Sequence, residues 1–219
     1  MSDHAFTTIL FDLDGTLTDP EIGITTCFQH ALRRFGIEEN DRENLRRVIG
    51  PPLVDSFVQF YGLSEEDAQL GVKYYRERFT DIGIFENTVY DGIPEMLEAL
   101  KSAGKKLVLA TSKPHVFATR ILEHFDLAKY IEFVSGSELD GTRNDKAEVI
   151  RYALEQTGTS PEEAIMVGDR KHDVIGAIKN NVEIIGVLYG HGSKEELVKA
   201  GANLLAGTPE ELTKIILNK

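Results

Sequence analysis

The sequence predicts an α/β fold in which a doubly wound, mainly parallel sheet carries an inserted helical cap domain. From about Asn87 to the end of the chain, apolar strand-like segments alternate with segments of helical pattern, which is typical of βαβ units. A further strand-like segment precedes Asp12 near the start. Between Thr18 and Glu86 the strand pattern is missing and apolar residues recur at helical spacing, which indicates a helical insertion after the first strand.

Turn residues and apolar runs set the elements of the expected core. Prolines just inside helix starts and glycines near helix ends mark the boundaries, and these residues are Pro94, Pro114, Pro209, Gly104, Gly158 and Gly201. After one strand within residues 1–17, the expected order is a helix from Gly92, a strand over 106–110, a helix from Pro114, a strand over 131–134, a helix from Lys146, a strand over 164–167, a helix from about Asp173, a strand over 183–188, a helix from Ser193, a short strand near 203–205 and a helix from Pro209. We expect the active site at the carboxyl ends of these strands.

The inserted segment is expected to be a cap of about four helices. Its helical pattern is carried by apolar residues that we interpret as core packing, namely Ile24, Phe28, Ala31, Leu32, Phe35, Leu45, Val48, Leu53, Phe57 and Phe60. The chain is therefore predicted to consist of a core, residues 1–17 and 87–219, and a cap, residues 18–86.

The composition agrees with a soluble protein of the cytoplasm. With 219 residues, 42% of them hydrophobic, the chain can bury a sizeable core, and its net charge of −12 argues against binding nucleic acid. The single cysteine, Cys27, excludes an internal disulfide and lies among apolar helical positions, so we expect a buried structural thiol in a reducing compartment. No run approaches the roughly 20 apolar residues of a membrane span, so we expect no membrane partner. A monomer or weak homodimer is expected.

The first strand ends in two carboxylates, Asp12 and Asp14. Side chains two apart on a strand point to the same face, so both acids project together where the strand enters a turn that contains Gly15. Like charges this close raise each other's pKa, and a bound cation or a protonated acid relieves the conflict. A bound cation and a protonated acid both suit catalysis. The alternative is a pair of acids without a catalytic role, at a strand end that is exposed to solvent.

Three later segments complete a pattern that resembles the haloacid dehalogenase-like (HAD) hydrolase superfamily. Residues 106–112 read as an apolar strand that ends in Thr and Ser, Lys146 opens a helix, and residues 164–173 read as an apolar strand followed by acids. Each segment alone is weak, but the four in this order cover nearly the whole chain and are specific together. The resemblance implies a Rossmann-like HAD core, and a cap directly after the first motif implies a small substrate.

The resemblance also implies a Mg²⁺-dependent phosphatase. Asp12 would be the nucleophile that forms an aspartyl-phosphate, and Asp14 the acid that protonates the leaving oxygen and then activates water. Thr111 and Lys146 would bind the transferring phosphoryl group. The implied Mg²⁺ ligands are Asp12, the main-chain carbonyl of Asp14, Asp169 and Asp173, the last directly or as an outer ligand.

Further residues are expected to bind the substrate. The main-chain amides of Gly15 and Ser112 would donate to the phosphoryl group. Residues 46–53, with Arg47, and the tripeptide that ends in Lys113 look most like the phosphoglycolate phosphatase-like branch, in which an arginine of the cap faces the substrate. The implied substrate is a small phosphate ester: phosphoglycolate, a nucleoside monophosphate or a sugar phosphate.

Two alternatives stay open, a phosphomutase of the hexose-phosphate type and a non-catalytic, phosphometabolite-binding regulatory protein. The mutase shares all four motifs, whereas a mere binder gains nothing from carboxylates that face a phosphate. Asp14 argues against a dehalogenase, and Lys73, the one lysine of the cap, lies too late in it for a phosphonate-cleaving enzyme.

The fourth segment of the pattern, residues 164–173, contains three cationic or titratable residues after its first acid. Arg170, Lys171 and His172 follow Asp169 where the family commonly has a small residue. They either bind a second anionic group or neutralise the acids around them, and we favour neutralisation. His115 and His191 are expected near loop edges of the site, but as surface residues, and receive no role.

Overall fold

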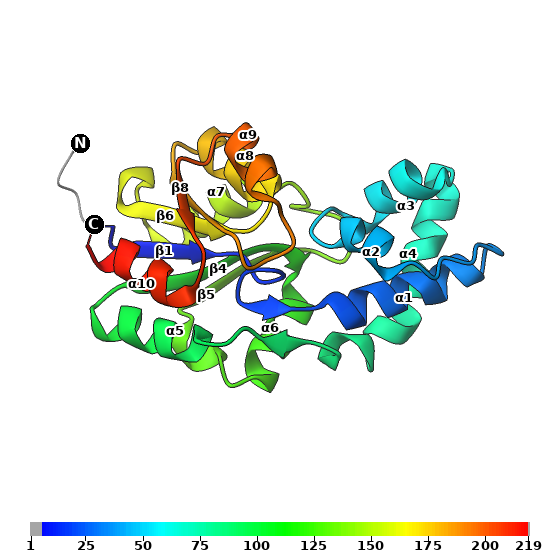
Figure 1. Cartoon of the computed structure of the whole chain (residues 1–219), viewed down its shortest axis with the longest axis horizontal. Coiled ribbons are helices and arrows are strands. Elements are labelled where there is room, and N and C mark those ends of the chain that lie inside the picture. The colour runs from blue at the N-terminus through cyan, green and yellow to red at the C-terminus, as the bar shows by residue number, and fades with distance from the viewer. Residues whose placement is uncertain (1–5, 219) are drawn as a thin grey trace. The chain divides into compact units, whose positions relative to one another are not determined.

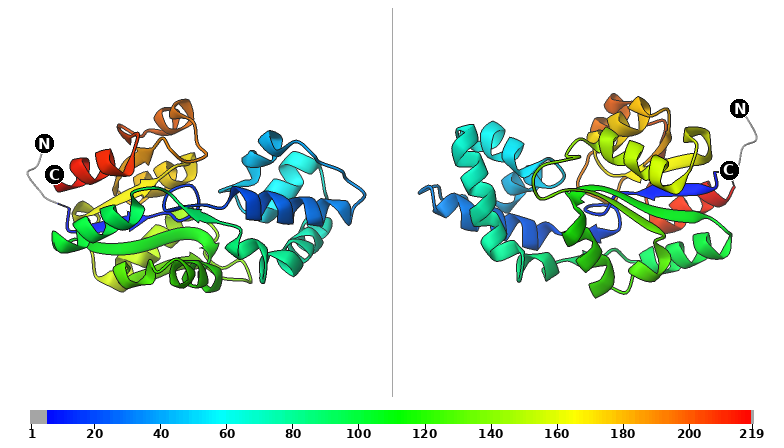
Figure 2. Two further views of the ribbon diagram at one scale, coloured as in Figure 1. Left: turned by 60° about the horizontal axis from the view of Figure 1, so that its bottom comes forward. Right: turned by 180° about the vertical axis from the view of Figure 1, so that it is seen from behind.

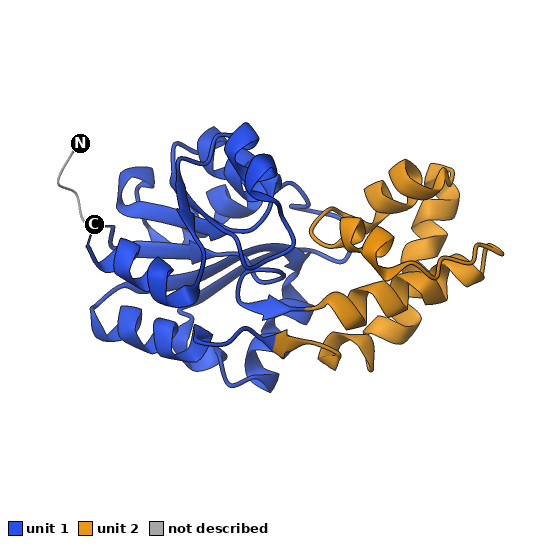
Figure 3. Ribbon diagram, in the orientation of Figure 1, with its two compact units in different colours: residues 1–19, 89–219 blue, residues 20–88 orange. Residues whose placement is uncertain are grey.

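The computed structural model describes residues 6–218, which divide into two compact units. Unit 1 comprises residues 1–19 and 89–219, and unit 2 comprises residues 20–88 (Figure 3). Residues 1–5 and 219, which were assigned to the core, lie outside the described residues. A separate two-stranded sheet is formed by β2 (Thr18–Asp19) and β3 (Thr88–Val89), where the chain leaves unit 1 and returns to it. The sequence pattern did not indicate these two short strands.

Unit 1 is built on a six-stranded parallel sheet. Its strands are β1 (Thr8–Phe11), β4 (Lys106–Pro114), β5 (Phe133–Ser137), β6 (Ala164–Gly168), β7 (Glu183–Val187) and β8 (Leu204–Ala206). Their order is β5-β4-β1-β6-β7-β8, and every neighbouring pair is parallel. Because the chain starts in the middle and winds first to one edge and then to the other, the predicted doubly wound sheet is confirmed.

Six α-helices of unit 1 cover the two faces of this sheet. They are α5 (Ile93–Ser102), α6 (His115–His124), α7 (Lys146–Thr157), α8 (Lys171–Lys179), α9 (Lys194–Ala200) and α10 (Pro209–Leu217), and the 3₁₀ turns η3 (Ala128–Tyr130) and η4 (Pro161–Glu163) lie between them. Helices α7, α8 and α9 lie on one face and α5, α6 and α10 on the other (Figures 1 and 2).

Several element boundaries differ from the prediction: β5 begins and ends later than the expected 131–134, and two other boundaries have clear local reasons. Strand β4 continues beyond Ala110 to Pro114, because its pairing with β5 resumes after a register shift. Helix α8 begins at Lys171 rather than near Asp173, because the Asp173 side chain accepts a hydrogen bond of 3.0 Å from the amide of Arg170 and so caps the first turn.

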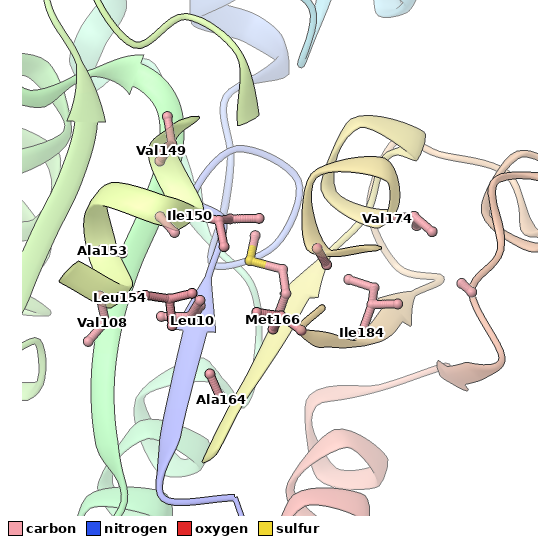
Figure 4. Packing of buried hydrophobic residues seen from close by; sticks show 14 of the residues in the cluster. Leu10, Val108, Val149, Ile150, Ala153, Leu154, Ala164, Met166, Val174 and Ile184 are labelled. Atoms are coloured by element: carbon pink, nitrogen blue, oxygen red, sulfur yellow. The ribbon is translucent and has the colours of Figure 1, made fainter. Parts of the chain in front are cut away.

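The core of unit 1 follows the alternation of the strands. Leu10, Val108, Met166 and Ile184 come from four strands and point to the same face, where they pack with residues of α7 such as Ile150 (Figure 4). Leu10, Met166 and Ile150 are fully buried, so truncating any of them to alanine costs about 2 to 5 kcal/mol. This rigid sheet holds the loops at its carboxyl edge.

Unit 2 is helical. It contains α1 (Glu21–Arg33), α2 (Arg42–Leu45), η1 (Arg46–Val48), α3 (Leu53–Tyr61), α4 (Glu65–Phe79) and η2 (Gly83–Phe85). Phe28 of α1 stacks on Phe57 of α3 with ring centroids 4.1 Å apart, and both are fully buried. Phe35, Leu53 and Phe60 are half-buried, while the other apolar positions read from the helical pattern are buried.

Cys27 lies in the core of unit 2, as predicted. Its side chain is fully buried, and a Cβ at Gly83 would overlap its sulfur, so the two segments pack in direct contact. Within residues 6–218, every helix is too short or too polar to cross a membrane.

Candidate active site

The turn after β1 places Asp12 and Asp14 at the carboxyl edge of the sheet. The amide of Asp12 donates to the Val167 carbonyl on β6 over 2.9 Å, which continues the strand pairing to the first acid. The chain then folds back at once, because the amides of Thr16 and Leu17 both donate to the carbonyl of Leu13. Asp12 is 6% exposed, so its carboxylate is buried and not a solvated strand end.

Lys146 lies between two of the predicted acids. It opens α7 behind the N-cap Asp145, and its Nζ is 2.8 Å from Asp12 Oδ1 and 2.8 Å from Asp173 Oδ1. The same nitrogen donates to the Ala110 carbonyl over 3.1 Å. Burial alone lowers the pKa of Lys146, but the charges of Asp12 and Asp173 outweigh it and raise the pKa above its ordinary value. Lys146 is therefore a permanently charged residue of the site and not a solvated helix residue.

Three buried carboxylates converge beside Lys146. One oxygen each of Asp12, Asp169 and Asp173 lies within 4.8 Å of the others. Burial, together with the charges of Asp173 and Asp12, raises the pKa of Asp169 to about 7. Burial likewise raises the pKa of Asp173 to about 6, although Lys146 opposes the rise. Two of the three acids pair with Lys146 and Asp169 does not, so the cluster carries an excess of negative charge that a cation would relieve.

Asp14 forms a second, separate ion pair. Its Oδ2 is 2.8 Å from Lys113 Nζ, and both side chains are largely buried. Burial raises the pKa of Asp14, and Lys113 only partly offsets the rise. Lys113 was predicted to bind substrate, and the structure places it against Asp14.

The end of β4 brings Thr111 and Ser112 to the same edge. The Thr111 hydroxyl is buried and accepts a hydrogen bond of 3.2 Å from the Lys113 amide, which leaves its own proton available for a ligand. The carbonyl of Ser112 accepts a hydrogen bond of 2.8 Å from the hydroxyl of Ser137 on β5. This bond fixes the strand end that carries both residues.

The Gly15 amide, predicted to bind substrate, has a partner within its own turn. That amide donates to the Thr18 carbonyl over 2.7 Å, so its proton is already used within the turn. Gly15 matters through its missing side chain, because its φ is +82° and a Cβ would overlap Asp169 Oδ2.

Of the charged residues after Asp169, Arg170 neutralises a neighbouring acid, Glu196, through its side chain, whereas Lys171 contributes its main-chain amide. Arg170 Nε donates to Glu196 Oε1 over 2.9 Å, and the Lys171 amide donates to the same oxygen over 2.8 Å. Burial lowers the pKa of His172, and Arg170 and Lys171 add to the effect.

The surface position expected for His191 is wrong, whereas that of His115 is confirmed. The His191 side chain is 6% exposed, and its amide donates to Asp169 Oδ2 over 2.8 Å. The available signal was its place: the Gly-His-Gly segment follows β7, the neighbour of β6, and carboxyl ends of parallel strands share one edge. His115 is exposed.

Arg47 belongs to unit 2, in the 3₁₀ turn η1. Its guanidinium lies 4.7 Å from the ring centre of Phe60 and 5.4 Å from that of Tyr61. Its Nε is buried without a hydrogen-bond partner. The aromatic rings hold the guanidinium by packing and cation–π attraction. The other predicted site residues lie in unit 1.

Comparison with known proteins identifies relatives over most of the chain. Residues 9–187 match the sequence profile of the haloacid dehalogenase-like hydrolases. A Pseudomonas aeruginosa protein named 5'-nucleotidase is 53% identical over 189 residues, 86% of each chain. The tyrosine-protein kinase PtkA of Mycobacterium tuberculosis is 36% identical over 210 residues, 95% of this chain and 72% of that protein. More distant relatives, 25% and 27% identical, are named phosphoglycolate phosphatases.

The fold has a close counterpart among solved structures. A crystal structure described as a predicted phosphatase from Clostridium acetobutylicum superimposes with a TM-score of 0.96 and 50% sequence identity, covering 98% of this chain and all of the other.

Proposed function

This chain belongs to the haloacid dehalogenase-like hydrolases and is a phosphoric monoester hydrolase, and from that premise we propose a Mg²⁺-dependent phosphatase that works through an aspartyl-phosphate on Asp12. The observation that carries the proposal is the cluster of three buried carboxylates, those of Asp12, Asp169 and Asp173, of which Asp12 and Asp173 pair with Lys146. Burying unpaired charge is costly, so this arrangement favours a role that uses the charge.

A divalent cation fits these residues. Asp169 Oδ1 is buried and has no hydrogen-bond partner, and Mg²⁺ prefers oxygen ligands of this kind. Asp12, Asp169 and the main-chain carbonyl of Asp14 would hold the ion. Both Asp173 oxygens already have partners, Lys146 and the Arg170 amide, so we assign Asp173 to the outer position that orients Lys146. When bound, the ion supplies positive charge for the phosphoryl oxygens.

In the first half-reaction an oxygen of Asp12 bonds to phosphorus while the bond from phosphorus to the ester oxygen breaks. Asp14, which burial keeps protonated beyond its usual range, gives its proton to the leaving oxygen. In the second half-reaction Asp14 takes a proton from water, the water oxygen bonds to phosphorus, and the bond to Asp12 breaks. Inorganic phosphate and the free carboxylate of Asp12 result.

Lys146 and Thr111 are proposed to bind the phosphoryl group during both steps. Lys146 is held by Asp12 and Asp173 and adds a fixed positive charge beside the nucleophile. Thr111 offers a buried hydroxyl whose proton is free to donate. Because these groups are ordered before substrate arrives, little reorganisation is needed at the transition state.

The proposed substrate is a small phosphate ester, with nucleoside 5'-monophosphates first and phosphoglycolate and sugar phosphates next. This order rests on the 53% identity to the protein named 5'-nucleotidase, since the phosphoglycolate phosphatases are more distant. Arg47 of the helical unit, proposed as a cap, is the candidate for contacting the substrate beyond its phosphate. The monomer or weak homodimer and the cytoplasmic location remain predictions.

The test is phosphate release from a panel of nucleoside monophosphates, phosphoglycolate and hexose phosphates, with Mg²⁺ or with excess chelator. Metal-dependent release from one class supports the proposal. Isomerised hexose phosphate without free phosphate would instead indicate a mutase, and binding without turnover a regulatory protein. Transfer to a tyrosine peptide would favour the activity named for the mycobacterial relative.

A further inference from the structure

The loop of residues 189–192, Tyr-Gly-His-Gly, follows β7 and packs against Asp169 and the turn after β1. The His191 amide donates to Asp169 Oδ2 over 2.8 Å. The Tyr189 hydroxyl donates to the Thr16 carbonyl over 3.2 Å, which ties the loop to the turn that carries Asp14. The loop therefore contacts a proposed metal ligand and the neighbouring turn at once.

The two glycines of this loop permit the close approach. A Cβ at Gly190 would overlap the carbonyl oxygen of Gly15 and lie 2.6 Å from Asp169 Oδ2. A Cβ at Gly192 would overlap the carbonyl oxygen of Asp169. Neither glycine has a positive φ, so space and not backbone conformation requires glycine here.

The imidazole of His191 is buried on the other side of the loop, and its Nε2 makes no hydrogen bond with the described residues. The side chain is 6% exposed, and its Nε2 lies 3.3 Å from Asp19 Oδ1 on β2. The same residue thus offers its amide to Asp169 and its ring to Asp19.

We propose that His191 is a positioning residue for the divalent-metal site. Its amide holds Asp169 Oδ2, so that the other oxygen, Oδ1, which is buried without a partner, is presented to the cation. Its buried ring, packed beside Asp19, fixes that amide in place. The inference rests on the proposed function, and it adds a residue that touches neither substrate nor metal. Removing such a supporting partner weakens metal binding by about 10- to 100-fold.

The test measures Mg²⁺ and Mn²⁺ binding to the full chain by calorimetry, together with the Mg²⁺ concentration needed for half-maximal phosphate release. His191→Ala is expected to weaken metal binding about tenfold and to raise the half-activating Mg²⁺ concentration by the same factor. Its turnover at saturating Mg²⁺ should stay near wild type. His191→Gln, whose amide can donate to Asp19, should recover most of the affinity.

Two matched controls separate positioning from general damage. His124→Ala removes an exposed histidine at the end of α6 and should leave metal binding unchanged. Gly190→Ala should weaken binding at least tenfold, whereas Gly207→Ala, whose Cβ meets only the end of the Glu211 side chain, should not.

An unchanged metal dissociation constant in His191→Ala would overturn the inference, even if Gly190→Ala failed to fold. A fall in turnover that saturating Mg²⁺ does not restore would also contradict it. If the wild type itself bound neither ion, the metal-dependent function would fail and this inference with it, a result distinct from a defect confined to the variants.

Discussion

Asp169→Asn is expected to stabilise the metal-free protein at pH 8, although it removes a proposed metal ligand. Without a cation, Asp169 is ionised at this pH beside Asp12 and Asp173, and burial and these charges raise its pKa to about 7. Against an ordinary value of 3.8, that corresponds to roughly 4 kcal/mol of destabilisation at about 1.4 kcal/mol per pKa unit. In the variant, the buried side-chain nitrogen of Asn lacks an acceptor, which costs about 1 to 3 kcal/mol. The variant should therefore be more stable than the wild type by about 1 to 3 kcal/mol.

The sign of the pH dependence follows from proton binding. The folded protein holds the Asp169 proton more tightly than the unfolded chain, so the penalty is absent below about pH 4 and complete above about pH 7. The advantage of the variant should therefore shrink as the pH falls from 8 to 5. Mg²⁺ should reverse the order, because binding at 1,000 times its dissociation constant adds about 4.1 kcal/mol to the wild type, more than the largest advantage expected for the variant.

Urea unfolding in excess chelator at pH 8 and pH 5, and again with Mg²⁺ at pH 8, measures these effects. Asp91→Asn, at an exposed position of the same unit, is the matched control and should change the free energy of unfolding by less than about 0.5 kcal/mol. The reasoning is refuted if Asp169→Asn is less stable than wild type in chelator at pH 8, or if its advantage does not depend on pH.

Three further predictions concern activity. Ca²⁺ should block phosphate release in competition with Mg²⁺, because it takes more oxygen ligands at longer distances and would hold Asp12 away from phosphorus. Full activity in excess chelator would overturn the metal assignment. Arg47→Ala should lower kcat/KM on the best natural substrate, by an amount equal to about 2 to 4 kcal/mol of lost transition-state stabilisation, and should leave kcat/KM on an aryl phosphate nearly unchanged. Equal losses on both substrates would assign Arg47 to support of the fold. Lys113→Met should raise the Asp14 pKa further and move the alkaline limb of the kcat/KM profile to higher pH, and an unmoved limb would separate Lys113 from the acid.

The fold was predictable because strand and helix periodicities alternate clearly from residue 87 onward, whereas the insertion before it shows helical periodicity alone. Strands β2 and β3 were not, since two residues each carry no periodicity. The extension of β4 past Ala110 also escaped prediction, because a register shift leaves no mark on the apolar pattern.

The acids and Lys146 could be located from the sequence because each follows or opens a recognisable element. Their pairing was only partly predictable. The bond from Lys146 to Asp12 follows from the motif order, whereas the ion pair between Asp14 and Lys113 depends on how β1 and β4 end side by side. The amide partners of Gly15 and His191 could not be read from the sequence, because tertiary contacts decide whether an amide bonds within a turn or to a neighbouring side chain.

The central claim is that Asp12 attacks phosphorus, and the most direct test is phosphate release by purified, Mg²⁺-loaded Asp12→Asn on the best substrate. The amide keeps the shape of the side chain and removes the nucleophile, so turnover should fall by at least about 10⁴-fold while the circular dichroism spectrum stays that of the wild type. Retention of more than a trace of activity by the folded variant would contradict the account and remove Asp12 from the chemical step.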